Sequence, residues 1–177
     1  MPDVTISPLS SSEGTVAALA RLLITTVADG GSVSFMHPLS ESAATAFWTR
    51  WLAAADRGEL IVLGGHQGDA LVGTVTLLLN CPPNQPHRAE IAKMMTLPAY
   101  RGRGIARALL VEAERLAVER GRTLLVLDTA TDGGASGLYE KQGFVFAGEI
   151  PNYAYRPHGG LTGTRLYWKA IGPANVG

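Results

Sequence analysis

The sequence has a single cysteine, Cys81, among its 177 residues. One cysteine excludes an internal disulfide and any metal site built from several cysteines, a composition that fits a reducing cytoplasm. An excess of charge of one sign is also lacking, because 15 Lys and Arg residues balance 15 Asp and Glu residues. A chain without net charge has no overall field that attracts nucleic acid or anionic lipid, so neither is an expected partner. Any charged ligand must therefore bind at a local site.

Long apolar runs are missing as well. The longest, residues 16–28, is interrupted by Arg21 and is shorter than the roughly 20 residues of a membrane helix. Residues 1–14 lack the basic and then apolar pattern of a signal peptide, so we expect a cytoplasmic protein without a membrane partner. The four histidines have no metal-ligand spacing, so no metal is expected. Charged residues make up 17% of the chain, below the usual value of about 25%, which leaves room for a homodimer interface.

Hydrophobic side chains make up 46% of the sequence, which suits one globular domain over residues 1–177. Apolar residues spaced three and four apart predict a helix after a capping box of Ser10 and Glu13, and further helices over residues 40–58 and 102–120. A short helix ending at Gln142 is also expected. Strands are expected at 3–7, 60–63, 70–79, 88–97, 123–127, from Phe144 onward and at 164–170, with a loop at 151–163. This order predicts an α+β fold, a mixed sheet with helices on both faces.

Residues 98–107, PAYRGRGIAR, form the sharpest local signal, because they follow a predicted strand and open a predicted helix. A helix start offers unpaired N–H groups, and Gly102 and Gly104 let a ligand approach the backbone closely. Three cationic donors belong to the same turn: Arg101, Arg103 and Arg107. The spacing matches neither a Walker loop nor a dinucleotide fingerprint. A diphosphate ligand is predicted, and an RNA-binding segment or a solvated helix cap is the alternative from these letters alone.

Two further motifs accompany this turn. The strand before it ends in KMMTLP, residues 93–98, and a later segment carries Ala135, Leu138, Tyr139, Gly143 and Phe144. Together with Arg101, Gly104 and Ala106, these residues resemble the GCN5-related N-acetyltransferase (GNAT) family over residues 88–146. The resemblance implies the acyl-CoA N-acyltransferase fold, with a mostly antiparallel central sheet, and acetyl-CoA as co-substrate.

The resemblance also implies where acetyl-CoA binds. Its diphosphate would lie on the turn and its pantetheine arm along the preceding strand, whose free edge can pair with amides as another strand would. The expected cofactor-binding residues are Met94, Met95, Thr96, Arg101, Gly102, Arg103, Gly104, Ile105, Ala106 and Arg107. A backbone N–H near Met95 would stabilise the oxyanion formed when an amine attacks the thioester. Asp132 stands where many family members have an Asn that contacts the cofactor.

Attack on a thioester needs a neutral amine, so a carboxylate is expected as general base. Glu90 lies on the strand that leads to the turn, and Asp128 ends the next apolar strand. A surface carboxylate and a turn cap are the alternative interpretations of these two residues. The family match implies that Tyr139 donates a proton to the departing thiolate, the alternative being a half-buried helix aromatic. Cys81 has no adjacent His, which favours direct transfer in a ternary complex.

The acceptor is expected to contact two loops, residues 30–39 and 151–163, through Ser34, Phe35, Tyr153 and Arg156. A closer likeness is to the tabtoxin-resistance members of the family, through segments such as residues 32–36 and 148–153. This likeness implies a small amino-acid-like amine, for example tabtoxinine-β-lactam. Two other functions stay open: acetylation of a protein or peptide N-terminus, and acyl-CoA sensing without catalysis.

Overall fold

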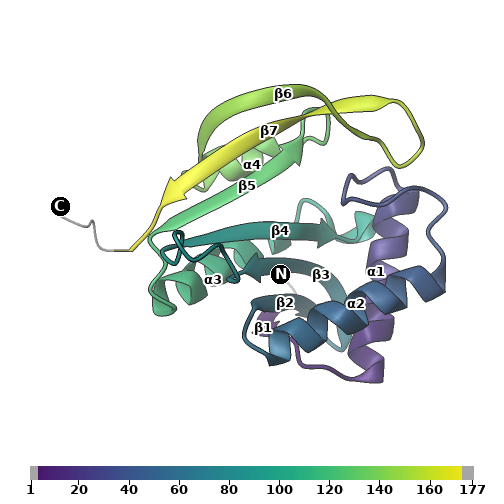
Figure 1. The fold of residues 1–177 in the computed structure, drawn as a ribbon. Coiled ribbons are helices and arrows are strands. Elements are labelled where there is room, and N and C mark those ends of the chain that lie inside the picture. The colour runs from purple at the N-terminus through teal and green to yellow at the C-terminus, as the bar shows by residue number, and fades with distance from the viewer. Residues whose placement is uncertain (1–3, 173–177) are drawn as a thin grey trace.

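A computed structural model describes residues 4–172 and contains a seven-stranded sheet with the order β1-β2-β3-β4-β5-β7-β6 (Figure 1). The strands are β1 (Val4–Pro8), β2 (Leu60–Gln67), β3 (Ala70–Leu78), β4 (Arg88–Thr96), β5 (Leu124–Ala130), β6 (Val145–Tyr155) and β7 (Leu161–Ala170). The helices are α1 (Glu13–Ala28), α2 (Glu41–Asp56), α3 (Ile105–Glu119) and α4 (Ser136–Lys141), with a 3₁₀ turn at Pro98–Tyr100. Strands β4 and β5 run parallel and the other neighbouring pairs run antiparallel. The predicted α+β class and mixed sheet are confirmed.

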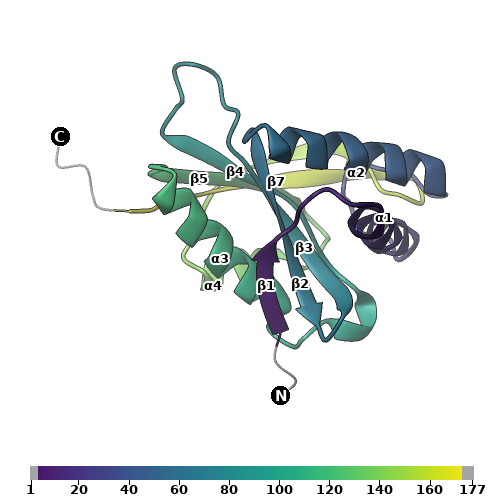
Figure 2. The ribbon, with the colours of Figure 1, turned by 90° about the horizontal axis from the view of Figure 1, so that it is seen from below.

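The half of the sheet formed by β1–β4 is covered on both faces, by α1 and α2 on one side and α3 on the other (Figure 2). Successive side chains of a strand point to opposite faces. In β2, Leu60 and Val62 therefore belong to the core under α1 and α2, whereas Ile61 and Leu63 belong to the core under α3. This double burial explains why β2 is a continuous apolar run in the sequence.

Helices α1 and α2 begin at serine caps. Ser40 accepts a hydrogen bond from the Ala43 N–H at 3.2 Å, as the predicted start of α2 requires. For α1 the predicted capping box of Ser10 with Glu13 is wrong, because the cap is Ser12, whose hydroxyl accepts from the Thr15 N–H at 3.1 Å. Within residues 4–172 no helix is long and apolar enough to cross a membrane.

The other half of the sheet, β5, β7 and β6, bends away from β4 (Figure 1). Its strands are longer than predicted, and the loop expected at residues 151–163 is wrong. Strand β6 continues to Tyr155 and β7 begins at Leu161, which leaves a short turn. The prolines and glycines of residues 151–163, Pro151 among them, favour a loop when the sequence is taken alone. Because β6 is the last strand in the order and its pairing is irregular between Ile150 and Ala154, a missing N–H there interrupts no inner ladder.

Candidate active site

Strands β4 and β5 part in the middle of the sheet. They pair only through Arg88, Ala89 and Glu90 of β4 within the described residues, and then diverge (Figure 1). The rest of this edge of β4 has backbone N–H and C=O groups that no neighbouring strand uses in the part of the chain that the structure describes. Such an edge can pair with an extended, amide-bearing ligand. Met94, Met95 and Thr96 lie on this segment of β4.

A β-bulge lies beside this edge. The register between β3 and β4 shifts so that Val75 faces two residues of β4, Lys93 and Met94. The extra residue reverses the faces of the strand. Ile91, before the bulge, belongs to the core under α3, whereas Met95, after it, belongs to the core under α1 and α2. Lys93 adopts a left-handed conformation with φ of 51°, which directs its side chain toward α2.

The turn between β4 and α3 lines a hollow of about 260 Å³. Its lining is Thr96, Tyr100, Arg101, Gly102, Gly104, Ile105, Ala106, Arg107 and Leu138. Gly102 and Gly104 have φ of 74° and 81°, and a Cβ atom added at either would meet no atom within 4 Å. Helix α3 begins at Gly104 without a side-chain cap, so its first N–H groups are available to an anion. This open, donor-rich turn fits a diphosphate.

The three arginines of the turn are exposed, but two of them already have protein partners. Arg101 donates from Nη1 to Asp29 Oδ2 at 2.6 Å, which ties the turn to the end of α1. Arg103 donates to the Ala99 carbonyl at 3.0 Å. The side chain of Ile105 is buried in the core, so this residue can reach a ligand in the hollow only through its backbone.

Tyr139 of α4 is buried against Phe144 and Tyr167, with ring centroids 5.9 and 6.1 Å away. Burial raises the pKa of its phenol to about 12, and the negative charge of Asp128 contributes to this increase. The phenol is therefore protonated at neutral pH and can donate a hydrogen bond or a proton. The preceding residue, Leu138, lines the hollow at the turn, so α4 borders that hollow.

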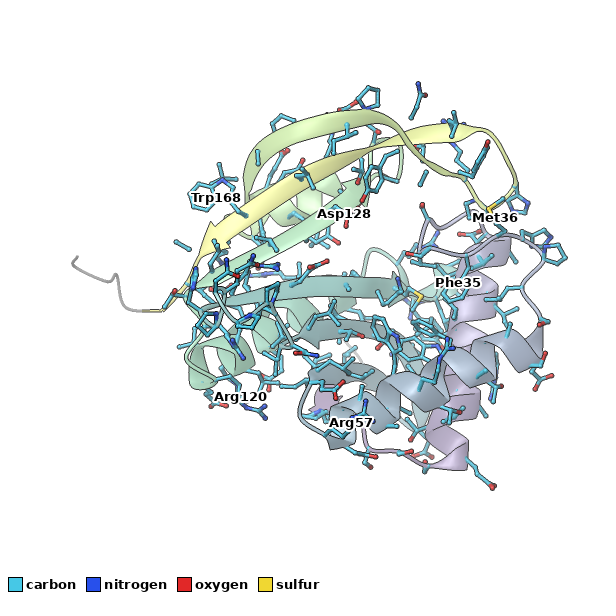
Figure 3. All side chains as sticks on the ribbon, viewed as in Figure 1. Phe35, Met36, Arg57, Arg120, Asp128 and Trp168 are labelled. Carbon is cyan, nitrogen blue, oxygen red and sulfur yellow. The ribbon has the colours of Figure 1, made fainter. Side chains whose placement is uncertain are left out.

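The two candidate bases lie on the strands that part. Asp128 is exposed on β5, above β4 in Figure 3, and accepts a hydrogen bond from the buried Thr164 hydroxyl at 2.8 Å. Glu90 accepts from Arg88 Nη1 at 3.4 Å. Burial lowers the pKa of the Lys93 ammonium, and the charges of Asp128 and Glu90 oppose this shift. Lys93, Glu90 and Asp128 therefore lie close enough to interact electrostatically, near the point where β4 and β5 diverge. Within residues 4–172 no three His, Cys, Asp or Glu side chains could hold a metal ion.

Lys93 is the charged group of this region that the sequence analysis did not select. Its Nζ donates to Ser34 Oγ at 3.0 Å and lies 5.9 and 5.6 Å from the ring centroids of Phe47 and Trp51. Phe35, near the end of β4 in Figure 3, packs edge-on against Phe47 at 5.1 Å. The signal that could identify it is a lysine flanked on both sides by apolar residues, within IAKMM at residues 91–95 of a strand.

The loop between α1 and α2 meets the turn between β6 and β7. The His37 N–H donates to the Pro157 carbonyl at 2.9 Å, and His158 Nε2 hydrogen bonds to the Ala28 carbonyl at 2.9 Å. The two imidazole rings lie 4.4 Å apart. These contacts join the two loops that were expected to hold the acceptor, on the side of the molecule where α1 ends (Figure 1).

The four predicted acceptor contacts do not gather in one place. Ser34 and Phe35 are part of the Lys93 surroundings described above. Tyr153 is 57% exposed on the edge strand β6. Arg156 donates from Nε to Asp132 Oδ2 at 2.5 Å, and both line a second hollow of about 240 Å³ that shares no residue with the hollow at the turn. Asp132 also accepts from Thr162 at 2.8 Å, and these hydrogen bonds lower the pKa of its carboxyl.

Comparison with known proteins gives a family match. The model of the acetyltransferase (GNAT) family matches residues 24–144. The N-alpha-acetyltransferase MAK3 of Arabidopsis thaliana is 32% identical over 96 residues, which are 54% of this chain and 50% of that protein. The chain therefore spans about half the length of this curated relative.

Solved structures show the same fold. The ribosomal-protein-alanine N-acetyltransferase of Brucella melitensis is 22% identical, with a TM-score of 0.80 over 94% of this chain and 99% of that one. The yncA protein of Salmonella typhimurium, solved with its cofactor acetyl-CoA, is 16% identical, with a TM-score of 0.76 over 98% of this chain and 96% of that one.

Proposed function

The chain belongs to the acetyltransferase (GNAT) family and has its acyl-CoA N-acyltransferase fold, and from this premise we propose that it transfers an acetyl group from acetyl-CoA to the primary amine of a small, amino-acid-like molecule. The observation that carries the proposal is the open turn before α3. This turn lies directly after the free edge of β4 and lines a hollow of about 260 Å³. It contains two glycines in the left-handed conformation, with no atom within 4 Å of an added Cβ, and it ends in the uncapped N–H groups of α3.

The residues present fit acetyl-CoA. Backbone N–H groups at the start of α3 and the guanidinium group of Arg107, which lines the hollow, would bind the diphosphate, and Arg103 would have to leave the Ala99 carbonyl to join them. The edge of β4 from Met94 to Thr96 would pair with the pantetheine amides, and a backbone N–H near Met95 would donate to the thioester carbonyl. Acetyl-CoA supplies a thioester carbon that an amine can attack, with formation of a C–N bond and cleavage of the C–S bond.

The chain's own groups would move the protons. The acceptor ammonium must lose a proton before attack, and Glu90 and Asp128 are the carboxylates beside the parted strands that can take it. Asp128 is exposed and oriented by the Thr164 hydroxyl, so it can pass the proton to water. Tyr139, with a pKa of about 12, keeps its proton at neutral pH and would donate it to the departing thiolate. A phenol with this pKa is a weak acid, so the transfer would depend on its position beside the sulfur.

A small acceptor is favoured by the contacts between the two loops. The hydrogen bonds that join His37 to Pro157 and His158 to Ala28 connect the loops that would otherwise flank an extended peptide. The second candidate, acetylation of a protein N-terminus, is supported by the likeness to the N-alpha-acetyltransferase MAK3. Peptides and free amino acids offered together distinguish the two functions, because a peptide enzyme would acetylate the peptides preferentially.

Several finer expectations stay predictions. They are the toxin acceptor implied by the tabtoxin-resistance likeness, the single domain over residues 1–177, the cytoplasmic location and the homodimer. A CoA-sensing protein would bind acetyl-CoA and acetylate no amine in a broad panel. Release of CoA during that panel would exclude sensing without catalysis.

The diphosphate assignment is tested by calorimetric titration with acetyl-CoA. The Gly104→Asp change puts a carboxylate into the open turn, and we expect at least about 100-fold weaker binding because the added charge repels phosphate and fills its space. Gly58→Asp is a matched control, because Gly58 has φ of 76° and also has no atom near an added Cβ, but lies at the end of α2. Equal affinities of the two variants would refute the assignment.

A further inference from the structure

Lys93 carries a positive charge that the chemistry proposed above does not use. Its Nζ is partly buried, and its hydrogen-bond partner is a neutral hydroxyl, Ser34 Oγ at 3.0 Å. The ion pairs between residues 4–172 do not include Lys93. A desolvated ammonium without a carboxylate in contact is costly, and an anion bound beside it would offset that cost.

The backbone holds Lys93 in an unusual conformation. The described residues other than glycine that have positive φ are Ser34 at 75°, Lys93 at 51° and Asn152 at 52°. Two of these three strained residues are joined to each other by the hydrogen bond between Lys93 and Ser34, although they lie 59 positions apart. Strain of this kind persists where the surrounding structure imposes it, and it is common at ligand sites.

Lys93 has aromatic rings on one side, and two carboxylates interact with its charge from a distance. The ammonium lies over the aromatic rings of Phe47 and Trp51, on the α2 side of β4. The carboxylates of Glu90 and Asp128 act on it electrostatically without contacting it. Glu90 precedes Lys93 by three residues, a span of roughly 10 Å along a strand. One cation and two carboxylates around the point where β4 and β5 part complement a zwitterion, whose ammonium would face the carboxylates.

We propose that Lys93 binds the carboxylate of the acceptor, so that the enzyme selects amines that carry a carboxylate close to the amino group, as amino acids do. This inference rests on the proposed N-acetyltransferase function and specifies its substrate class. The rings of Phe47 and Trp51 lie beside the ammonium and cover part of it, and partial desolvation strengthens a charge-assisted hydrogen bond to the acceptor. Lys93 thereby fixes which end of the acceptor points to Glu90 and Asp128.

A different role for Lys93 is to hold the loop of Ser34 against β4. Loss of that link would impair every acceptor to a similar extent, whether or not it carries a carboxylate. Recognition of the carboxylate, in contrast, affects only acceptors that have one. The ratio of the rates for acceptors with and without a carboxylate therefore distinguishes the two roles, whereas the rate for a single acceptor does not.

The test compares each free L-amino acid with its carboxamide at saturating acetyl-CoA, with CoA release as the readout. The amide differs in amine basicity, so the decisive quantity is the change in the acid-to-amide ratio of kcat/KM between wild type and variant. For Lys93→Met we expect this ratio to fall about 10- to 100-fold, the usual effect of losing a hydrogen bond to a charged group. Lys93→Arg should restore most of the preference, because it keeps the charge.

Lys141→Met serves as the control, because it removes an exposed lysine from α4 and should leave the ratio at its wild-type value. Lys93→Gln replaces Lys93→Met if the latter does not fold, as judged by circular dichroism. A ratio unchanged in the Lys93 variants would overturn the carboxylate subsite and leave the acetyltransferase proposal intact. If wild type binds acetyl-CoA but acetylates only peptides, the small-acceptor proposal and the subsite both fail.

Discussion

The two halves of the sheet are built differently. In β2 of the first half, Leu60, Ile61, Val62 and Leu63 are all at most 8% exposed, because helices cover both faces. In the second half the face opposite α4 is open at the paired residues Trp168 of β7 and Val145 of β6, which are 41% and 48% exposed. The covered half carries the turn and the strand edge proposed to bind acetyl-CoA. If the proposal is correct, the covered half binds the common co-substrate and the more open half adjoins the acceptor.

Truncation of equivalent leucines tests this difference most strongly. Leu77 of β3 is fully buried, whereas Leu166 of β7 is 39% exposed. Leu77→Ala should lower the free energy of unfolding by about 2–5 kcal/mol, since it loses apolar burial and leaves a cavity. Leu166→Ala should lower it by less than about 1 kcal/mol. Urea denaturation of both variants provides the measurement, and equal losses would show that the open face is covered in solution.

Tyr139 of α4 lies on the packed face of the second half, where it is buried beside Tyr167 of β7. Its pKa is about 12 in the folded protein and about 10 in an unfolded chain. Between these values the unfolded state has released the proton and the folded state has not, so stability falls as pH rises from 10 to 12. The loss should approach about 3 kcal/mol, from two pKa units at 1.36 kcal/mol each. Urea unfolding of wild type and Tyr139→Phe at several pH values measures it, and parallel pH curves would contradict it.

Two strand glycines allow the packing of the two halves to be compared by adding a single methyl group to each. A Cβ at Gly73 of β3 would lie 2.9 Å from Ile105 Cγ2 and 3.1 Å from the Met95 carbonyl oxygen, whereas a Cβ at Gly148 of β6 would meet nothing within 4 Å. Gly73→Ala should cost about 1–3 kcal/mol through overpacking. Gly148→Ala should instead be neutral or stabilising by up to about 1 kcal/mol, because it restricts the unfolded chain. Thermal melting checks the opposite signs.

The covered half was also the more predictable from sequence. Helices α2 and α3 follow apolar spacings that local physics enforces, and the cap at Ser40 was identified correctly. The cap of α1 was misplaced because three consecutive serines, residues 10–12, offered the same chemistry. The open half gave weaker signals. Strand β6 has no buried face to impose alternation along its length, and Pro151 is tolerated there only because of its edge position, which depends on the whole sheet.

The candidate site was predictable only in part, for a similar reason. The motif turn is local, so its glycines and arginines could be read directly from the sequence. Contacts between distant positions could not be read, because no local pattern encodes them. Examples are Arg101 with Asp29, 72 positions apart, and Lys93 with Ser34.

Two buried threonines give the smallest predicted effects. The hydroxyl of Thr76, fully buried in the covered half, has no hydrogen-bond partner within residues 4–172, so Thr76→Val should raise stability by about 1 kcal/mol by removing a desolvated polar group. Thr164, 2% exposed in the open half, donates to Asp128, so Thr164→Val should lower stability by about 1 kcal/mol. Urea unfolding measures both changes. If Asp128 is the base, Thr164→Val should also reduce kcat, an effect that Thr76→Val should lack. If both variants change the free energy of unfolding in the same direction, the presence or absence of a hydrogen-bond partner for the threonine hydroxyl does not explain the two effects.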